Sequence, residues 1–324
     1  MKIFIALLSL VLSLTAHLAH SATLPGIPKF IDEMVTKHQF KREELESVFT
    51  QAQHQPSVIE AISRPSTIRP WPDYRASFVN QERIKLGLKF WHEYRKTLRH
   101  AERKYGVPQE IIVALIGVET IYGKNAGNFR IIDALTTLAF DYPRRSDFFR
   151  DELENFLLLA QEQQFDMLDV RGSYAGALGI PQFMPSSYRN HAVDFNGNHK
   201  IDLLHEARDA IGSVANYLKN YGWISKESIA VRAQVSEEYC AGEIATPRTL
   251  VEWSAAGVVP NMKLPPEKNA RLLDFTVEGG KEFWLALDNF EVIRRYNSSD
   301  FYAMSVLQLA EELKAARRAG KSFR

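Results

Sequence analysis

Residues 106–123 read GVPQEIIVALIGVETIYG, and this stretch decides the fold class. Gly106 is suited to end a preceding helix, and Pro108 is favoured at the start of a new one. The apolar residues that follow recur at the three- and four-residue spacing of one helix face: Ile111, Ile112, Leu115 and Ile116. The stretch therefore predicts a helix with an apolar face that runs toward Gly123.

Glu119 falls on this apolar face, one turn beyond Leu115 and Ile116. Most glutamates on helices are solvated, so the placement of this one among aliphatic side chains is informative. A carboxyl that is removed from water is pushed toward its protonated form, which a general acid needs near neutral pH. Gly117 and Gly123 bracket Glu119 and are small enough to leave room for a substrate. We therefore predict that Glu119 is a catalytic acid.

The chain on either side of this stretch is mostly helical in pattern. Apolar residues between Phe78 and Tyr105 recur at helical spacing and predict one long amphipathic helix. Three further helices are expected, over residues 151–163, 209–220 and 304–317. Strand patterns are concentrated in one part of the chain, over residues 229–235, 272–277 and 282–287.

These patterns predict a mainly α fold with a small β-containing insertion. We expect a helical catalytic region that comprises residues 22–227 and 292–324, interrupted by a β-containing segment over residues 228–291. The length of 324 residues is enough for about two domains and a sizeable core.

The composition is that of an ordinary packed globular protein, with 45% hydrophobic and 24% charged residues. The 40 Lys and Arg residues nearly balance the 39 Asp and Glu residues, so no overall positive field would hold a polyanion. This balance argues against nucleic acid as a partner. Cys240 is the only cysteine, which excludes an internal disulfide, a cysteine-based zinc site and an iron–sulfur cluster.

The first residues have the pattern of a secretory signal peptide. Lys2 precedes an apolar run over residues 3–18, and Ala19 and Ser21 are the small residues that a cleavage site requires. We expect residues 1–21 to be removed and the mature protein to be soluble in the periplasm. The alternative is an uncleaved anchor, but the run is shorter than the ~20 residues of a spanning helix, and no later stretch could span a bilayer. No cysteine near the cut could carry a lipid.

Two further stretches carry groups that can bind a ligand. Arg144 and Arg145 are adjacent, and residues 172–188 are rich in glycine and include the donors Ser173 and Gln182. Glycines allow a backbone to approach a ligand closely, but the stretch lacks the Lys-Ser/Thr ending of a phosphate-binding loop. Taken alone, adjacent arginines are often surface charge, and a Gly-rich stretch is often a structural turn.

Residues 194–202 approach the calcium-binding loop of an EF-hand. Oxygen donors stand at loop positions one, three, five, seven (a carbonyl) and nine: Asp194, Asn196, Asn198, Lys200 and Asp202. Position six is His199 where glycine is usual, and position twelve is His205 where a bidentate glutamate is usual. Histidine tolerates a left-handed backbone better than most residues, which weakens the first objection. The alternative is a solvated turn rich in Asp and Asn.

Taken together, these motifs resemble the membrane-bound lytic murein transglycosylase B family. The resemblance covers nearly the whole mature chain and rests on residues 71–74, 117–123, 141–145, 172–186, 209–217 and 295–297. Members are soluble or lipid-anchored bacterial enzymes with a goose-lysozyme-like core that cleave the glycan strands of peptidoglycan. The resemblance therefore implies a lysozyme-like helical core, with peptidoglycan glycan strands and their stem peptides as partners.

The resemblance implies that Glu119 is the sole catalytic acid and base. It would protonate the glycosidic oxygen between N-acetylmuramic acid (MurNAc) and N-acetylglucosamine (GlcNAc). The 6-hydroxyl of MurNAc would then attack the anomeric carbon, which gives a 1,6-anhydro end without water and without a cofactor. The residues that match the cleft around this acid are Ser173, Gln182, Tyr217, Tyr296, Asn297 and Tyr302. The residues that match the glycan and stem-peptide sites are Tyr74, Arg144 and Arg145, and arginine suits the carboxylates of a stem peptide.

The resemblance also bears on the calcium loop, because the family carries a lengthened EF-hand-like loop that a later acid closes. Asp209 is the best candidate for this acid, and Glu206 is the second. One loop with few carboxylates is expected to bind calcium weakly, so the ion would be structural rather than a signal.

Two other functions remain open at this point. A lysozyme-type hydrolase ordinarily places two carboxyls across the scissile bond, and no second acid lies in the Glu119 motif. Asp133, Asp141 and Asp147 are the nearest downstream acids, and the fold could bring one of them close. A glycan-binding module without catalysis is the other alternative, and it predicts that binding is the only activity left when Glu119 is removed.

Overall fold

The computed structural model describes residues 24–64, 69–237, 239 and 246–320. The expected signal peptide, residues 1–21, and Cys240 lie outside these described residues. The helices are α1 (Ile27–His38), α2 (Arg42–Gln51), α3 (Pro56–Ser63), α4 (Trp71–Phe78), α5 (Gln81–Glu93), α6 (Arg95–Tyr105), α7 (Gln109–Thr120), α8 (Ile131–Asp141), the 3-10 helix η1 (Pro143–Arg145), α9 (Ser146–Gln163), α10 (Pro185–His191), α11 (Ala207–Asn220), α12 (Leu250–Ala255), α13 (Asp288–Tyr296) and α14 (Asp300–Arg318). The strands are β1 (Phe129–Arg130), β2 (Arg171–Gly172), β3 (Ala230–Val235), β4 (Arg248–Thr249), β5 (Val258–Pro260), β6 (Asn269–Val277) and β7 (Gly280–Ala286). The mainly α fold with a small β-containing part is therefore confirmed.

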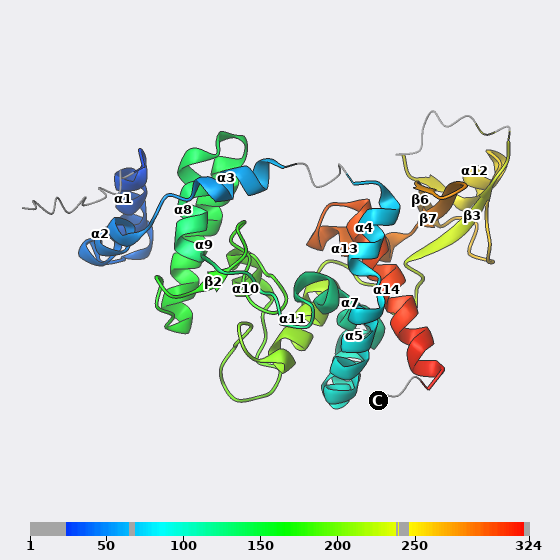
Figure 1. Ribbon diagram of the computed structural model, residues 1–324, viewed down its shortest axis with the longest axis horizontal. Helices are drawn as coiled ribbons and strands as arrows, with labels where there is room; N and C mark the ends of the chain where they lie inside the picture. The colour runs from blue at the N-terminus through cyan, green and yellow to red at the C-terminus, as the bar shows by residue number, and fades with distance from the viewer. Residues whose placement is uncertain (1–23, 65–68, 238, 240–245, 321–324) are drawn as a thin grey trace, which may run out of the picture.

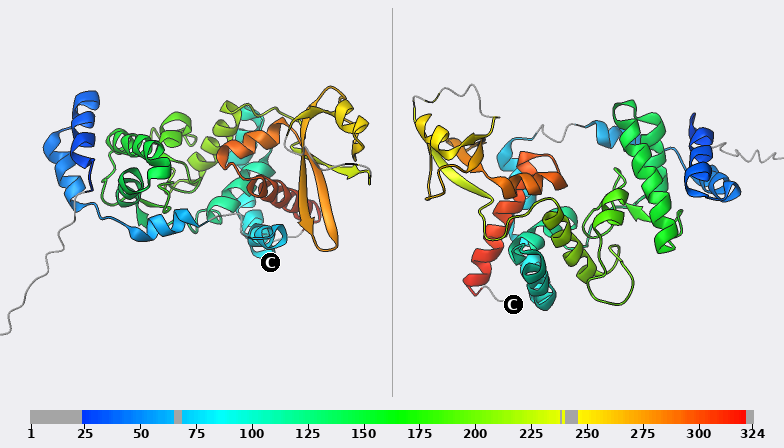
Figure 2. Two further views of the ribbon diagram at one scale, coloured as in Figure 1. Left: turned by 90° about the horizontal axis from the view of Figure 1, so that it is seen from above. Right: turned by 180° about the vertical axis from the view of Figure 1, so that it is seen from behind.

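The centre of the helical body is α7, which packs against α5, α6, α11 and α14 (Figure 1). Its residues 111–118 are all buried, so α7 is covered on every side rather than on one apolar face only. Because α7 carries Glu119 near its end, this packing holds that residue inside the body. Helices α1, α2, α3, α8, α9 and α10 extend the body away from α7, and α1 and α2 form one end of the molecule (Figures 1 and 2).

The single long helix expected between Phe78 and Tyr105 is wrong. The chain instead forms the end of α4, then α5 and α6, with Tyr94 between α5 and α6 at φ −98° and ψ 22°. Asn80 begins α5, because its side chain accepts a hydrogen bond from the Arg83 backbone at 3.0 Å. Both halves pack on α7, and the break lets each reach a further partner of its own: α14 for α5, and α11 for α6.

Apart from β1 and β2, which form a separate two-stranded sheet, the β strands lie together at the other end of the molecule from α1 and α2 (Figures 1 and 2). They form an antiparallel sheet in the order β4-β6-β7-β3-β5, and a tight hairpin joins β6 to β7 at Gly279. The sheet and α12 enclose a small apolar core that includes Trp253 and Leu272. The sheet is tied to the helical body where Trp71 of α4 packs on Phe275, with ring centroids 4.7 Å apart.

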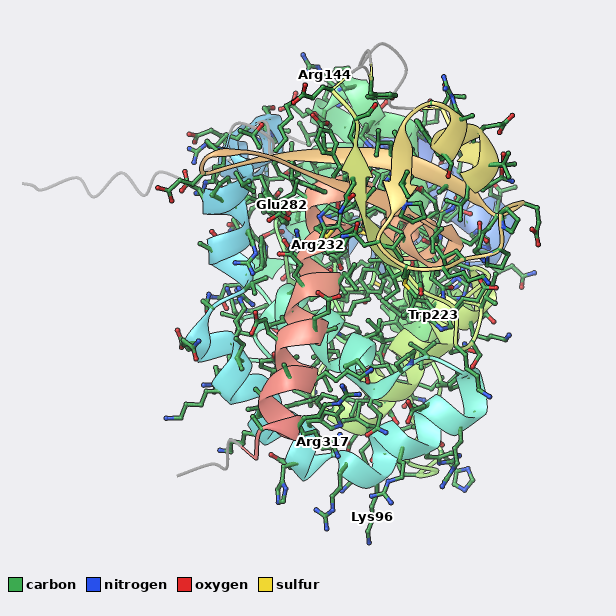
Figure 3. The ribbon with its side chains drawn as sticks, turned by 90° about the vertical axis from the view of Figure 1, so that its right-hand side faces the viewer. Lys96, Arg144, Trp223, Arg232, Glu282 and Arg317 are labelled. Atoms are coloured by element: carbon green, nitrogen blue, oxygen red, sulfur yellow. The ribbon has the colours of Figure 1, made fainter. Side chains whose placement is uncertain are left out.

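Figure 3 shows Arg232 and Glu282 on neighbouring strands beside α14, and their side chains form an ion pair at 3.2 Å. Among the described helices, none combines the length and the apolar character that crossing a membrane requires.

Candidate active site

Glu119 lies in the last turn of α7, directly before an unusual reversal of the chain. Ile121, Tyr122 and Gly123 all have positive φ values, of 52°, 62° and 87°. Non-glycine residues rarely adopt this conformation, so surrounding contacts must hold it in place. The Thr120 hydroxyl does so, because it donates to the carbonyl of Ile180 at 2.8 Å and accepts from the Gly123 backbone at 2.9 Å. The position of Glu119 is thus fixed by a rigid helix end.

The carboxyl of Glu119 has two polar neighbours that change its acidity. The phenol of Tyr302, from α14, donates a hydrogen bond to Glu119 Oε1, and the guanidinium of Arg83, from α5, acts on it through its charge. Burial raises the pKa of Glu119 to about 7, although the Tyr302 hydrogen bond and the Arg83 charge both act to lower it. A carboxyl with this pKa can both give and take a proton near neutral pH.

Four tyrosines, each from a different helix, feel the charge of this carboxyl: Tyr74 of α4, Tyr217 of α11, Tyr296 of α13 and Tyr302 of α14. Burial raises the pKa of each phenol, and the charge of Glu119 raises each of them further. The rings of Tyr217 and Tyr296 are 4.8 Å apart between centroids, and the phenol of Tyr217 donates to the Arg295 carbonyl at 2.8 Å. The fold therefore gathers these predicted site residues around Glu119.

The Gly-rich stretch is attached to the same site. The Ile180 carbonyl accepts from Thr120, as described above, and the phenol of Tyr296 donates to the carbonyl of Pro181. Within the stretch, Ser173 Oγ accepts from the Ala177 backbone at 3.0 Å. Gln182 has φ 52°, and its Nε2 donates to the carbonyls of Ala126 at 3.0 Å and Gly179 at 2.9 Å. The Ser173 hydroxyl, as an acceptor, and the Gln182 amide, as a donor, therefore both help to build the loop itself.

The remaining predicted substrate residues lie at exposed positions. Arg144 and Arg145 belong to η1, between α8 and α9, and the guanidinium of Arg145 lies 4.2 Å from the ring centroid of Phe148. Arg144 lies at the outer edge of the molecule in the view of Figure 3. Asn297 directly follows α13 and is exposed. The contacts of the described residues do not join the two arginines to the tyrosines around Glu119.

Comparison with known proteins assigns the chain to a family. The model of the transglycosylase SLT domain matches residues 24–311. The chain belongs to this family.

Individual relatives and solved structures agree with this assignment. Membrane-bound lytic murein transglycosylase B of Escherichia coli K12 is 42% identical over 306 residues, which cover 91% of this chain and 84% of the relative. The soluble lytic transglycosylase SltB1 of Pseudomonas aeruginosa is 45% identical, with a TM-score of 0.85 over 91% of this chain and 100% of that chain. The Escherichia coli transglycosylase Slt35, solved in complex with calcium, is 43% identical, with a TM-score of 0.86 over 91% and 95% of the two chains.

A more distant structure shows a ligand. SltB3 of Pseudomonas aeruginosa, solved with NAG-anhNAM-pentapeptide, is 30% identical to this chain. Its TM-score is 0.79, and the match covers 89% of this chain and 78% of SltB3.

The three alternative acids of this SLT-domain chain are engaged away from Glu119. Asp133 is buried and accepts from the side chain of Arg130 at 2.8 and 2.9 Å and from the backbone of Gln53 at 2.9 Å. Asp141 is exposed and pairs with a histidine, and Asp147 is exposed in the first turn of α9. None of the three is among the groups that shift the pKa of Glu119.

The calcium-like loop lies between α10 and α11. Asp194 accepts from the backbones of Gly197 and His199, each at 2.7 Å, and His199 has φ 66°, the left-handed conformation of position six. Asn196 and Asn198 accept from the backbones of residues 198 and 200 at 2.9 Å. No three His, Cys, Asp or Glu side chains converge as a metal cluster within the described residues, but EF-hand loops also use amide and carbonyl oxygens.

Asp209, the expected closing acid, lies in the first turn of α11 and is fully buried. Its carboxylate accepts from the backbones of Phe195 at 2.9 Å, Asn196 at 3.2 Å and Asp202 at 3.0 Å. Burial raises the pKa of Asp209, and these three hydrogen bonds act against that rise. Glu206, the second candidate, instead begins α11 by accepting from the Arg208 backbone at 3.1 Å.

Two residues at this site, Arg83 and Tyr122, were not predicted from the sequence, and the prediction for Gly117 is wrong. Gly117 does not leave room for a substrate, because a Cβ atom there would lie 2.5 Å from the Tyr122 phenol oxygen. The space is thus filled by Tyr122. Arg83 stands among other basic residues in the α5 sequence and has no local pattern that separates it from surface charge. Only the contact between α5 and α7 reveals its position.

Proposed function

We propose that this protein is a lytic murein transglycosylase that cleaves the MurNAc-β-1,4-GlcNAc bond of peptidoglycan and leaves 1,6-anhydro-MurNAc ends. The observation that carries the proposal is the environment of Glu119, a carboxyl with a pKa of about 7 that accepts a hydrogen bond from Tyr302 and acts by its charge on three further tyrosines. The family assignment and the relative solved with NAG-anhNAM-pentapeptide support it.

The proposed reaction uses Glu119 twice. The protonated carboxyl gives its proton to the glycosidic oxygen, and the bond from this oxygen to the MurNAc anomeric carbon breaks. The 6-hydroxyl of MurNAc then bonds to that carbon and returns its proton to the Glu119 carboxylate. The hydrogen bond from Tyr302 stabilises the carboxylate between the two steps. No second carboxyl is needed, in agreement with the engagement of Asp133 elsewhere.

We assign substrate binding to two groups of residues. The glycan would contact the residues around Glu119 and the Gly-rich stretch: Tyr74, Ser173, Gln182, Tyr217, Tyr296, Asn297 and Tyr302. The stem peptide would contact Arg144 and Arg145, because exposed guanidinium groups can pair with its carboxylates in a bidentate manner. The tyrosine rings suit the apolar faces of sugar rings.

Analysis of the released fragments tests the proposed reaction. Purified cell walls are digested with the wild-type protein and with Glu119→Gln, and the soluble muropeptides are identified by mass spectrometry. Anhydro ends that depend on Glu119 support the proposal. Reducing ends would indicate a lysozyme-type hydrolase, and binding of glycan without any release would indicate a binding module.

We further propose that the α10–α11 loop holds a structural calcium ion. The side chains of Asp194, Asn196, Asn198 and Asp202 and the carbonyl of Lys200 would supply oxygen ligands, and Asp209 would close the loop. The left-handed backbone at His199 and the calcium complex of the relative Slt35 support this site. The ion would stabilise the loop and take no part in the chemistry.

We also infer the organisation and location of the mature chain. Residues 22–227 and 292–324 would form the catalytic region and residues 228–291 a separate β-containing segment, which is supported by the small apolar core of the sheet. Removal of residues 1–21 would leave a soluble protein. We place this protein in the periplasm because its proposed substrate, peptidoglycan, lies in that compartment. Recovery of the protein in the membrane pellet after a high-salt wash would contradict this location.

A further inference from the structure

Arg83 connects two helices at the point where Glu119 is held. Its guanidinium donates through Nε to the Ser77 carbonyl at 3.2 Å and through Nη1 to the carbonyl of Gly117 on α7. The same group lies 5.2 Å from the ring centroid of Phe78 and is half-buried. Because it is bonded to both sides, this guanidinium cannot swing freely as a surface arginine does.

The backbone of Arg83 is held as firmly as its side chain. The phenol of Tyr122 donates to the Arg83 carbonyl at 3.0 Å. The Tyr122 ring fits between α5 and α7, where a Cβ atom at Gly87 or at Gly117 would lie 2.3 or 2.5 Å from its phenol oxygen. Tyr122 also belongs to the strained reversal that follows Glu119. The two glycines thus allow a close approach of α5 and α7 that brings Arg83 to the end of α7.

We propose that Arg83 is a positioning residue for the reaction of Glu119, a cation clamped at the end of α7 to stabilise the carboxylate that forms when Glu119 gives up its proton. This role rests on the proposed function of Glu119. The proton passes from Glu119 to the glycosidic oxygen and returns from the 6-hydroxyl of MurNAc. Arg83 touches neither of these oxygens, and it stays charged throughout.

The other groups that face the Glu119 carboxyl carry no charge. They are the phenols of Tyr74, Tyr217, Tyr296 and Tyr302, from α4, α11, α13 and α14. Burial raises the pKa of each phenol above its ordinary value, so all four are neutral near pH 7. Arg83 is therefore the one cation among the described residues that shift the pKa of Glu119. Without Arg83, burial would raise the pKa of this carboxyl, and only the hydrogen bond from Tyr302 would act to lower it.

The test compares Arg83→Gln, which removes the charge, with Arg83→Lys, which keeps it. The rate of anhydro-muropeptide release from soluble glycan strands is measured against pH. Cleavage requires protonated Glu119, so the rate holds below its pKa and falls as the pH rises through it. We expect Arg83→Gln to move this alkaline fall upward by about one pH unit and to lower the plateau rate about tenfold, because the carboxylate is less stable. Arg83→Lys should leave the fall within about 0.3 pH unit of its wild-type position.

A second readout does not depend on activity. The pKa of Glu119 is followed by carbon NMR of the side-chain carboxyl in protein labelled at glutamate, and the signal is assigned by its absence in Glu119→Gln. This pKa should rise in Arg83→Gln and stay near its wild-type position in Arg83→Lys. A lowered rate or melting temperature without a change in this pKa would mean that Arg83 is merely structural, and the inference would be overturned.

Two controls separate the outcomes. Tyr122→Phe removes the bond to the Arg83 carbonyl but no charge, and it should move the Glu119 pKa upward by a smaller amount. It therefore tests the clamp even if Arg83→Gln does not fold, and no movement would contradict the clamp. If the wild-type protein releases no anhydro ends, the proposed function is wrong. If the wild type is active and the pKa of Glu119 is unchanged in folded Arg83→Gln, only the role of Arg83 is wrong.

Discussion

Two carboxyls that the fold shields from water, the half-buried Glu119 at the end of α7 and the fully buried Asp209 at the start of α11, show how the same group can be made reactive or structural. Asp209 accepts three backbone hydrogen bonds from the loop between α10 and α11. Glu119 accepts one hydrogen bond from the phenol of Tyr302, and burial raises its pKa to about 7. Both carboxyls lose hydrogen bonds to water, but only at Asp209 do several fixed backbone N–H groups replace them.

The position on the helix adds to the difference. Asp209 lies in the first turn of its helix, where the positive end of the helix dipole favours a carboxylate. Glu119 lies in the last turn, where the negative end favours the protonated acid. Glu119 is therefore the candidate acid of the two, because few donors are aimed at its carboxyl, whereas several are aimed at that of Asp209.

The largest effect is expected for Glu119→Gln. Glutamine keeps the size of the side chain but can neither give nor take the proton, so release of anhydro-muropeptides should fall at least about a hundredfold. The measurement is muropeptide release from purified cell walls. Asp147→Asn, a change at an exposed acid of α9, is the matched control and should retain wild-type activity. Near wild-type release by a well-folded Glu119→Gln protein would show that Glu119 is not the catalytic acid.

The stability of Glu119→Gln should depend on pH in a defined direction. The native-state pKa of Glu119 is raised from the usual 4.5 to about 7, so the wild-type fold loses stability as the pH rises between these values, because the unfolded chain gives up the Glu119 proton and the folded protein keeps it. Glutamine cannot ionise, so the stability of the variant lacks this dependence on pH. The free energy of unfolding of Glu119→Gln minus that of the wild type should therefore be roughly 2–3 kcal/mol larger at pH 8 than at pH 4. Urea unfolding at the two pH values measures it. Equal stability differences at both would show that Glu119 is not kept from water.

Asp209→Asn should destabilise the fold with little direct effect on the reaction. The amide can accept hydrogen bonds only through one oxygen, and its NH₂ group would face a backbone donor. A loss of about 1–3 kcal/mol is expected in the free energy of unfolding. Activity per folded molecule should stay near that of the wild type. Glu206→Gln is the control, because Glu206 is only half-buried and accepts a single backbone hydrogen bond, and it should cost less than about 1 kcal/mol. Equal losses in the two variants would contradict the structural role of Asp209.

The smallest effect is expected from calcium. An ion that binds only the folded loop stabilises it by mass action, so millimolar calcium should raise the melting temperature by about 2–5 °C. Asp194→Ala should abolish the rise, and Asp147→Ala should retain it. A melting temperature that calcium does not change would favour the solvated turn rich in Asp and Asn.

Part of this site was predictable because it depends on neighbours in the sequence. The apolar spacing around Glu119 predicted its removal from water, and the raised pKa agrees with that prediction. The strand patterns over residues 229–235, 272–277 and 282–287 correspond to β3, β6 and β7. The expected helices over 151–163, 209–220 and 304–317 lie within α9, α11 and α14. Periodicity suffices for these features because a helix or strand repeats its faces at a fixed spacing.

The rest was decided by contacts between distant parts of the chain. Tyr302 is 183 residues from Glu119, and its role at the site came from the family resemblance rather than from any local pattern. The break at Tyr94 and the filling of the space above Gly117 by Tyr122 both depend on how α5, α6 and α7 pack together. The sequence by itself determined which faces are apolar and where a buried acid stands. The tertiary structure alone decided which donors and charges reach that acid, because a side chain acts on a carboxyl through space over a few ångströms and not through its separation along the chain.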